Sequence, residues 1–248
     1  MNIDIHVVCW NEMQIVPFVV DYWKKIARRV YVYDNGSTDG TLEFLKKFDW
    51  IEVINFKTDG FNDQKHAEIK NNCWKGSDAD WVWVSDFDEC PYSEHFTEDI
   101  KWLEENGYSV VFPQWLDVIS TTNVPEYKQG KLLHELVDGA IATRGDINKP
   151  TKVLFFKPNK VKEMNYSVGS HSCKPNGEIK MCSKLNTIHF KNLGIDYVLE
   201  RYDKYRKRLS EVNRKNGWGY QYLLNDNAHK QWLAEHIKQA RPIKDLLI

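Results

Sequence analysis

Two aspartates separated by one residue are the first candidates for chemistry in this sequence. Asp86 and Asp88 directly follow four consecutive apolar residues, 81–84, which predict a buried strand. Side chains two positions apart in an extended chain point to the same side, so both carboxylates should face one point in space. Carboxylates held together repel each other unless a cation lies between them, and hard oxygen ligands suit Mg²⁺ or Mn²⁺. The pair therefore predicts a divalent metal site, and an acidic turn after a strand is the alternative.

The elements that must position these aspartates can be read from the hydrophobic periodicity of the first half of the chain. Short apolar runs predict strands at 3–9, 30–33, 51–56 and 81–84. The three intervals between them have the apolar spacing or the capping residues of helices. This alternation predicts a doubly wound parallel sheet, in which ligands bind outside the carboxyl ends of the strands.

Polar residues follow the ends of three predicted strands, so they should meet at one edge of the sheet. They are Trp10 with Asn11, Asp34 with its turn, and the stretch 86–89. The carboxylate of Asp34 can accept hydrogen bonds from the N–H of a base or from ribose hydroxyls, and Trp10 could stack on the base. A turn residue that bonds to its own backbone is the alternative for Asp34. The sequence has no glycine-rich phosphate-binding motif, so a divalent ion is the expected way to hold a diphosphate.

The second half of the chain carries weaker patterns. The periodicity dissolves from 113 to 150, which predicts a long irregular or functional loop. Asn-Gly at 176–177 favours a hairpin that joins strands at 167–173 and 178–182, and 185–190 predicts a last strand. The remainder of the chain is predicted to be helical and basic.

Composition narrows the class of protein. Apolar residues make up 42% of the 248 residues, enough for a large core, and the net charge of −1 argues against nucleic acid as the main partner. The five cysteines are odd in number and lack paired spacing, which favours a reducing compartment. Residues 1–4 lack the features of a signal peptide, and no apolar run is long enough to cross a bilayer. We therefore expect a cytoplasmic protein.

A narrow apolar seam runs along the predicted terminal helix. Its members follow a spacing of four and three residues: Val198, Tyr202, Tyr205, Leu209 and Val212. The seam predicts that this helix packs on its own domain. Self-association through a partner helix and peripheral contact with an anionic membrane are the alternatives.

Three motifs in order give the chain a resemblance to a known family. They are N-E-x4-P from Asn11 to Pro17, D-N-G-S-T-D from Asp34 to Asp39, and D-x-D-E from Asp86 to Glu89. Together they resemble the family 2-type glycosyltransferases of GT-A fold over roughly the first ninety residues. The resemblance implies an α/β fold with a Rossmann-like, mostly parallel sheet flanked by helices, followed here by a C-terminal helical extension.

The resemblance also implies roles for particular residues toward a nucleotide-sugar donor such as a UDP- or GDP-sugar. Asp34 would contact the nucleoside, with Trp10 and Asn11 lining the same pocket. Asp86 and Asp88 would hold Mn²⁺ or Mg²⁺ on the diphosphate of the donor, so that Asp86 counts among the donor-binding residues as well as the metal ligands. Gln64 or the neighbouring Lys65 falls where this branch of the family contacts the donor.

Beyond Glu89 the resemblance supplies two further candidates. Asp117 is the candidate catalytic base, since Glu98-Asp99 comes too early after the metal motif and is explained as a helix cap. Several GT-A enzymes supply a histidine metal ligand after the last strand, and His189 matches that location. His171 is the alternative, with an acceptor or sugar contact as its competing role.

These inferences predict a GT-A domain at 1–194 and a helical extension at 195–248. The domain divides into a nucleotide-sugar half at about 1–112 and an acceptor half at about 113–194. The predicted function is metal-dependent transfer of a sugar from a nucleotide-diphosphate sugar to a glycan or lipid-linked acceptor. A nucleotidyltransferase that makes sugar nucleotides and a non-catalytic carbohydrate-binding module are the alternatives. A zinc site is a further alternative, with these four ligands: His171, Cys173, Cys182 and His189.

Overall fold

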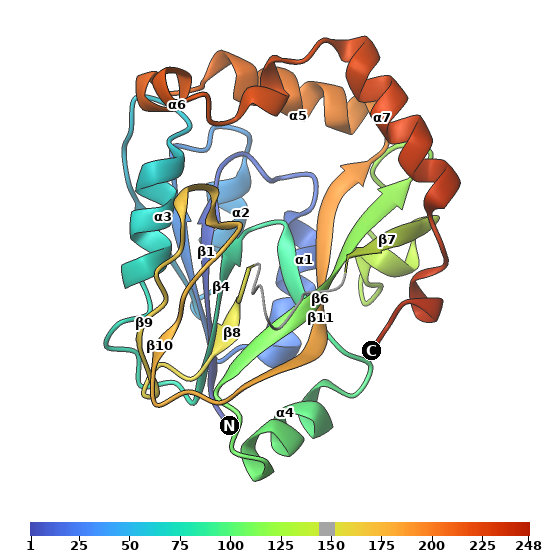
Figure 1. Cartoon of the computed structure of the whole chain (residues 1–248). Helices are drawn as coiled ribbons and strands as arrows, with labels where there is room; N and C mark the ends of the chain where they lie inside the picture. Colours follow the sequence, from blue (N-terminus) through green and yellow to red (C-terminus); the bar gives the residue numbers. More distant parts are fainter. Residues whose placement is uncertain (144–151) are drawn as a thin grey trace.

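A mixed sheet forms the centre of the molecule in the computed structural model, which describes residues 1–143 and 152–248 (Figure 1). Its strands within the described residues are β1 (Ile3–Cys9), β2 (Arg29–Asp34), β3 (Ile51–Asn55), β4 (Trp81–Asp86), β5 (Glu89–Tyr92), β6 (Val110–Ser120), β7 (Gly139–Thr143), β8 (Phe155–Phe156) and β11 (Met181–Leu193). They lie in the order β3-β2-β1-β4-β8-β6-β11-β5, with β7 beside β6. The two short strands β9 (Val161–Glu163) and β10 (Asn176–Gly177) form a separate pair.

The first half of the sheet is parallel, as predicted. Strand β1 pairs in parallel with β2 and β4, and β2 pairs in parallel with β3. Helices α1 (Val16–Ile26), α2 (Thr41–Leu45) and α3 (Asp63–Asn72) follow the first three strands. Ile5, Val32 and Trp83 are fully buried, which explains why these strands read as apolar runs. The carboxyl ends of the four strands therefore lie at one edge of the sheet.

The prediction of an irregular loop at 113–150 is wrong for much of that range. Strand β6 continues from Val110 to Ser120, and Gly139–Thr143 forms β7, while 144–151 lie outside the described residues. The strand was predicted to end before Pro113 because proline has no N–H to donate to a neighbouring strand. The structure accommodates it through a register shift in β11 between Ser183 and Asn186, within which Leu185 has a φ of 68°.

The predicted hairpin around Asn176-Gly177 is also wrong. These two residues pair with β9, and Val168–Ser170 forms the short helix η2. A Cβ atom on Gly177 would lie 2.2 Å from the carbonyl oxygen of Lys160, so close backbone approach requires this glycine. Residues 181–193 form one long strand, which includes the predicted 185–190 and runs parallel to β6.

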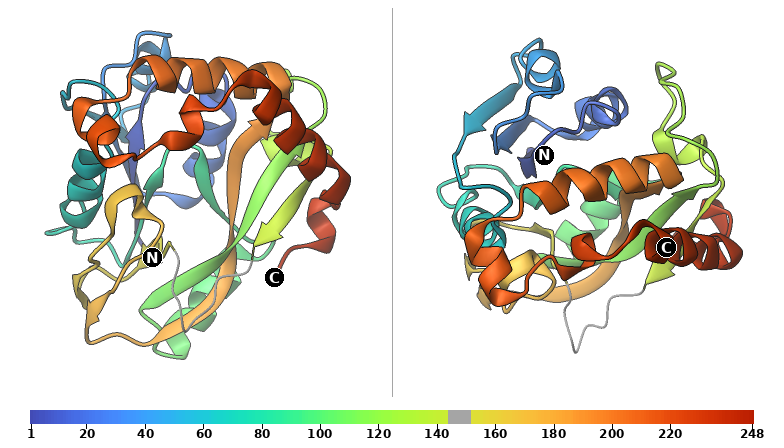
Figure 2. Two further views of the ribbon diagram at one scale, coloured as in Figure 1. Left: turned by 45° about the horizontal axis from the view of Figure 1, so that its top comes forward. Right: turned by 90° about the horizontal axis from the view of Figure 1, so that it is seen from above.

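The C-terminal helices cross the carboxyl edge of the sheet and then continue down its side beside β7 (Figures 1 and 2). They are α5 (Ile195–Lys207), α6 (Glu211–Asn216), η3 (Tyr220–Leu223), α7 (Asp226–Gln239) and η4 (Ile243–Asp245). Val198 and Tyr202 of the predicted seam are buried against the rest of the chain. Helices α4 (Phe96–Glu105) and η1 (Leu133–Glu135) complete the described helices. Within the described part of the chain, no helix combines the length and apolar character needed to span a bilayer.

Candidate active site

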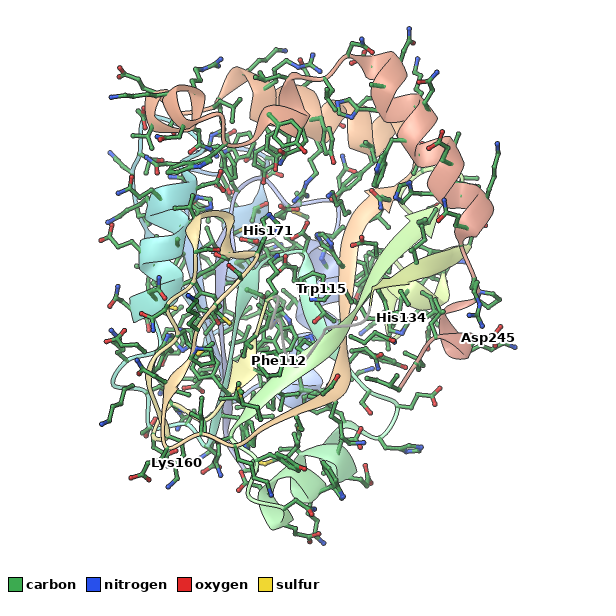
Figure 3. The ribbon with its side chains drawn as sticks, viewed as in Figure 1. Phe112, Trp115, His134, Lys160, His171 and Asp245 are labelled. Atoms are coloured by element: carbon green, nitrogen blue, oxygen red, sulfur yellow. The ribbon has the colours of Figure 1, made fainter. Side chains whose placement is uncertain are left out.

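A cavity of about 390 Å³ lies between the carboxyl ends of the strands and the C-terminal helices. Its wall includes Trp10 and Glu12 after β1, the stretch 86–89 after β4, and His189 on β11. Helix α3, the η2 loop, helix α5 and helix η3 supply much of the rest, together with Phe61, Lys152 and Lys191. Figure 3 shows His171 on the loop that reaches toward the C-terminal helices, at the end of the sheet away from Lys160. The cavity lies where the strand pattern predicted a ligand site.

Asp86 and Asp88 both line this cavity, while Phe87 points the other way. The Phe87 ring is buried and meets the edge of Trp23 in the core, with ring centroids 4.9 Å apart. Phe87 and Asp88 lie in the turn between β4 and β5, so the turn, not strand alternation, sets this arrangement. The two aspartates nevertheless have different partners, so they do not form a bare pair of like charges.

Asp88 lies between an arginine and a histidine. Its Oδ2 atom accepts a hydrogen bond from Arg201 at 2.8 Å and lies 3.5 Å from His189 Nε2. Burial raises the pKa of Asp88, but the charges of Arg201 and His189 outweigh burial and hold the pKa below its usual range. Arg201 also donates to Glu12 at 2.8 Å. Burial raises the pKa of Glu12 to about 7, because it outweighs the opposing charge of Arg201.

Asp86 instead faces two lysines. Lys70 Nζ lies 2.8 Å from Asp86 Oδ1, and Lys152 Nζ lies 3.7 Å from Asp86 Oδ2. Lys152 also donates to the buried carboxylate of Glu89. Burial raises the pKa of Asp86, yet the two lysine charges leave it lower than its usual value. Asp86 therefore remains ionised and already has cationic partners from the protein itself.

Asp88, Glu89 and His189 form the group best suited to hold a metal ion. One ligand atom from each lies within 4.8 Å of the others. Carboxylate oxygens with an imidazole nitrogen are acceptable donors for Mn²⁺, and the oxygens suit Mg²⁺. Of the predicted ligands Asp86, Asp88 and His189, the structure brings the last two together and adds Glu89. Sequence analysis included Glu89 in the D-x-D-E motif without giving it a role.

Asp117 and His189 are direct neighbours on adjacent strands. They are register partners between β6 and β11, and His189 Nδ1 lies 2.6 Å from Asp117 Oδ1. Burial lowers the pKa of His189, but Asp88 and Asp117 outweigh it and raise the pKa to about 9. The Asp117 carboxylate thus orients the imidazole through the nitrogen that faces away from Asp88.

Asp34 is fully buried, and its carboxylate is occupied by its own turn. It accepts hydrogen bonds from the backbone N–H of Gly36 at 2.8 Å, the N–H of Ser37 at 3.0 Å and the Ser37 hydroxyl at 2.5 Å. Asn11 lies beside this turn and accepts from the Thr38 N–H at 2.7 Å. These contacts match the turn alternative for Asp34.

Trp10 lines the cavity but one face of its ring is covered. The Arg208 guanidinium lies 3.9 Å from the ring centroid. Arg208 also donates to the backbone oxygen of Asn35 at 2.8 Å, which ties the C-terminal segment to the turn after β2. The structure therefore places an arginine where sequence analysis expected a base to stack.

Gln64 and Lys65 lie in the first turn of helix α3 and are not among the described residues that line the cavity. Lys65 is half-buried and pairs with Glu68 at 2.9 Å. The residues of α3 that line the cavity are Asp63, His66 and Lys70. His66 and Lys70 are four residues apart and so share one face of the helix.

Sequence analysis missed Lys70, Lys152 and Arg201. None belongs to a recognised motif, and each reaches the site only through the packing of a separate segment. Lys70 lies six residues after the predicted donor contact at Gln64, which is not a spacing that places two side chains on one helix face, so no local signal marked it. The zinc alternative finds no support, because in the part of the chain that the structure describes the metal-ligating group includes neither Cys173 nor Cys182.

Comparison with known proteins identifies the family. The family model described as Glycosyl transferase family 2 matches residues 4–175, which is more than half of the chain. The chain therefore belongs to glycosyl transferase family 2, and it has the mostly parallel sheet and flanking helices of the GT-A fold. A comparison with curated proteins finds no match.

Solved structures of S. aureus TarS are similar to this chain. One crystal structure of TarS has 15% identity and a TM-score of 0.47, and the match covers 84% of this chain and 39% of that one. TarS 1–349 in complex with UDP has 14% identity and a TM-score of 0.47, with coverage of 96% and 71%. TarS 1–349 in complex with UDP-GlcNAc has 15% identity and a TM-score of 0.42, with coverage of 96% and 72%. The chain thus spans 39% of the length of the first TarS chain.

Proposed function

We propose that this glycosyltransferase moves a sugar from a nucleoside diphosphate sugar, such as a UDP- or GDP-sugar, to a carbohydrate acceptor with the help of Mn²⁺ or Mg²⁺. The observation that carries the proposal is the group of Asp88, Glu89 and His189, whose ligand atoms lie within 4.8 Å of one another in the cavity wall. Membership of family 2 supports glycosyl transfer, and the position of the cavity supports binding of a nucleotide there.

Asp88, Glu89 and His189 would hold the metal ion, and Asp86 would lie beside the donor. A divalent ion held there would neutralise charge on the nucleoside diphosphate leaving group. Asp117 keeps His189 in a fixed orientation, and Arg201 fixes Asp88 relative to Glu12. Asp117 also remains our candidate base. Its contact with His189 supports the orienting role more directly.

The acceptor is proposed to be a glycan or a lipid-linked sugar. The C-terminal wall of the cavity carries Trp218, Tyr220 and Tyr222. Tyr220 is 69% exposed, and such rings provide flat apolar surfaces for sugars. An aromatic rim on an otherwise charged cavity supports a carbohydrate acceptor over a peptide or a nucleic acid.

A screen of nucleotide sugars with and without Mn²⁺ tests the proposal. We expect one UDP- or GDP-sugar to be hydrolysed slowly in the presence of Mn²⁺ and faster when a suitable glycan is added. Release of pyrophosphate from a nucleoside triphosphate and a sugar phosphate would instead identify a nucleotidyltransferase. Binding of glycans without turnover of any donor would identify a carbohydrate-binding module.

A further inference from the structure

Two buried lysines lie beside the metal-binding group without belonging to it. Among the described residues that line the cavity, Lys70 is 3% exposed and Lys152 is 8% exposed. A buried ammonium group is costly unless it is paired. Both lysines face Asp86, whose side chain is 36% exposed, so their charges lie close to the open space of the cavity.

Lys152 is held in place from two sides. Its ammonium group donates to Glu89 and lies 4.6 Å from the centroid of the Trp115 ring. Figure 3 shows Trp115 near the middle of the molecule, on strand β6. Lys70 is fixed by helix α3, which Asn62 caps by accepting a hydrogen bond from the Lys65 N–H at 3.0 Å. Neither lysine needs a large rearrangement to present its charge to a ligand.

The acidic motif is therefore neutralised before any ion is added. Asp86 faces both lysines, Glu89 bonds to Lys152, and Asp88 bonds to Arg201. Asp86 and Asp88 therefore do not need a metal ion to offset their mutual repulsion, because cationic side chains of the protein already do so. An ammonium group has three N–H donors, so each lysine can bind a phosphate oxygen while it keeps a carboxylate contact.

We propose that Lys70 and Lys152 bind the diphosphate of the donor directly, so that the site retains part of its donor affinity without a divalent ion. This inference rests on the proposed function, because it takes the ligand to be a nucleoside diphosphate. It goes beyond that function by separating donor binding from metal binding. The lysines would contribute to binding of the diphosphate both with and without a bound metal ion.

Calorimetry in EDTA tests this separation. The probes are UDP, GDP and the matching nucleosides, with a second series in Mn²⁺. In EDTA we expect wild-type protein to bind one of the two diphosphates about tenfold more tightly than its nucleoside. Lys152→Met and Lys70→Met should each remove most of that preference and leave nucleoside affinity unchanged. Diphosphate binding by wild type only in Mn²⁺, or an undiminished preference in both variants, would overturn the proposal.

Lys157→Met is the matched control. Lys157 is also a partly buried, ion-paired lysine that faces a tryptophan ring, but its partners are Glu104 and Trp81. The cavity wall does not include Lys157 among the described residues. This variant should bind diphosphate and nucleoside as wild type does.

A purely structural role for Lys152 predicts a different result. If the lysine only neutralised Glu89, removing both charges in Lys152→Met/Glu89→Gln would restore diphosphate affinity in EDTA. Restoration would overturn the proposal, and continued weak binding would support it. Should the methionine variants unfold, Lys152→Arg preserves the charge and should keep the preference for diphosphate, whereas Lys152→Gln should lose it. Wild type that binds neither diphosphate even in Mn²⁺ would refute the proposed function as well.

Discussion

The turn after β2 and the end of β4 both present aspartates at the carboxyl edge of the sheet, but these aspartates find their partners differently. Asp34 accepts all of its observed hydrogen bonds from Gly36 and Ser37, within three residues. Glu89 and Asp88 instead pair with Lys152 and Arg201, which lie 63 and 113 residues further along the chain. The first arrangement is a local turn, and the second is assembled by the tertiary fold.

We infer from this difference that Asp34 has a structural role, whereas the carboxylates after β4 act on a ligand. Asp34 is completely buried, and a ligand would have to break the turn to reach its carboxylate. The carboxylates after β4 contact cationic side chains in the wall of a cavity, so a ligand in that cavity can reach these charged groups without breaking a turn. We therefore expect substitutions after β4 to impair activity, and substitution of Asp34 to impair stability.

The largest effect is expected for Asp88→Asn. Loss of this charge weakens the metal-binding group, so turnover with saturating donor should fall by at least about 1,000-fold, equivalent to about 4 kcal/mol. Asp86→Asn should also remove most activity, because the lysines beside it lose their shared partner. Circular dichroism should show that both proteins remain folded. If either variant turns over at a rate near that of wild type, the substituted aspartate has no role in catalysis.

Asp34→Ala should lower the free energy of unfolding by about 2–3 kcal/mol, because buried N–H donors lose their acceptor. Urea denaturation measures this loss. Asp39→Ala is the control in the same turn: its side chain is exposed and accepts from Met13 and Thr41, so we expect a loss below about 1 kcal/mol.

Nucleotide binding to folded Asp34→Ala sharpens the comparison further. The motif resemblance predicts weaker binding of the nucleoside diphosphate with little change in metal affinity. If calorimetry shows unchanged nucleotide affinity, Asp34 only stabilises its turn and does not contribute to nucleotide binding.

His189→Ala should raise the Mn²⁺ concentration needed for half-maximal activity by at least about tenfold, since a metal ligand is lost. Asp117→Asn should produce a smaller shift of the same kind, because it acts through the orientation of His189. His171→Ala is the control and should leave the Mn²⁺ requirement close to that of wild type. Equal Mn²⁺ dependence in wild type and His189→Ala would end the assignment of His189 as a ligand.

The smallest effect concerns His6 on β1, the strand between β2 and β4. Burial lowers the pKa of His6 to about 4, although Asp4 opposes the shift. The unfolded chain therefore binds a proton more readily than the folded protein, and stability should fall as the pH drops below about 6.5. His6→Phe keeps the stacking on Tyr31 and removes this dependence.

Between about pH 7 and pH 5.5, wild type should lose roughly 1 kcal/mol more stability than His6→Phe. Urea denaturation at the two pH values measures the difference. Parallel losses in the two proteins would show that His6 protonation does not contribute to acid sensitivity.

The sequence by itself determined the features that depend on near neighbours. Apolar runs predicted β1 and β4 because these strands are buried on both faces, and shorter apolar runs predicted β2 and β3, which are only partly buried. The residues of the D-N-G-S-T-D motif predicted a turn because Asp34 can bond to the backbone N–H groups that follow it. The spacing of two residues predicted that Asp86 and Asp88 face the same space, and both line the cavity while the Phe87 ring packs in the core, although a turn after β4 holds Asp88 there.

Only the tertiary structure decided which charges meet at the site. Lys152 and Arg201 carry no local pattern that marks them, and they reach Glu89 and Asp88 because separate segments pack against the end of β4. Likewise β6 continues past Pro113 because its neighbour β11 shifts register there. Bonds within a turn depend on a few adjacent residues, whereas these contacts depend on the order of strands and the docking of α5, which sequence periodicity does not encode.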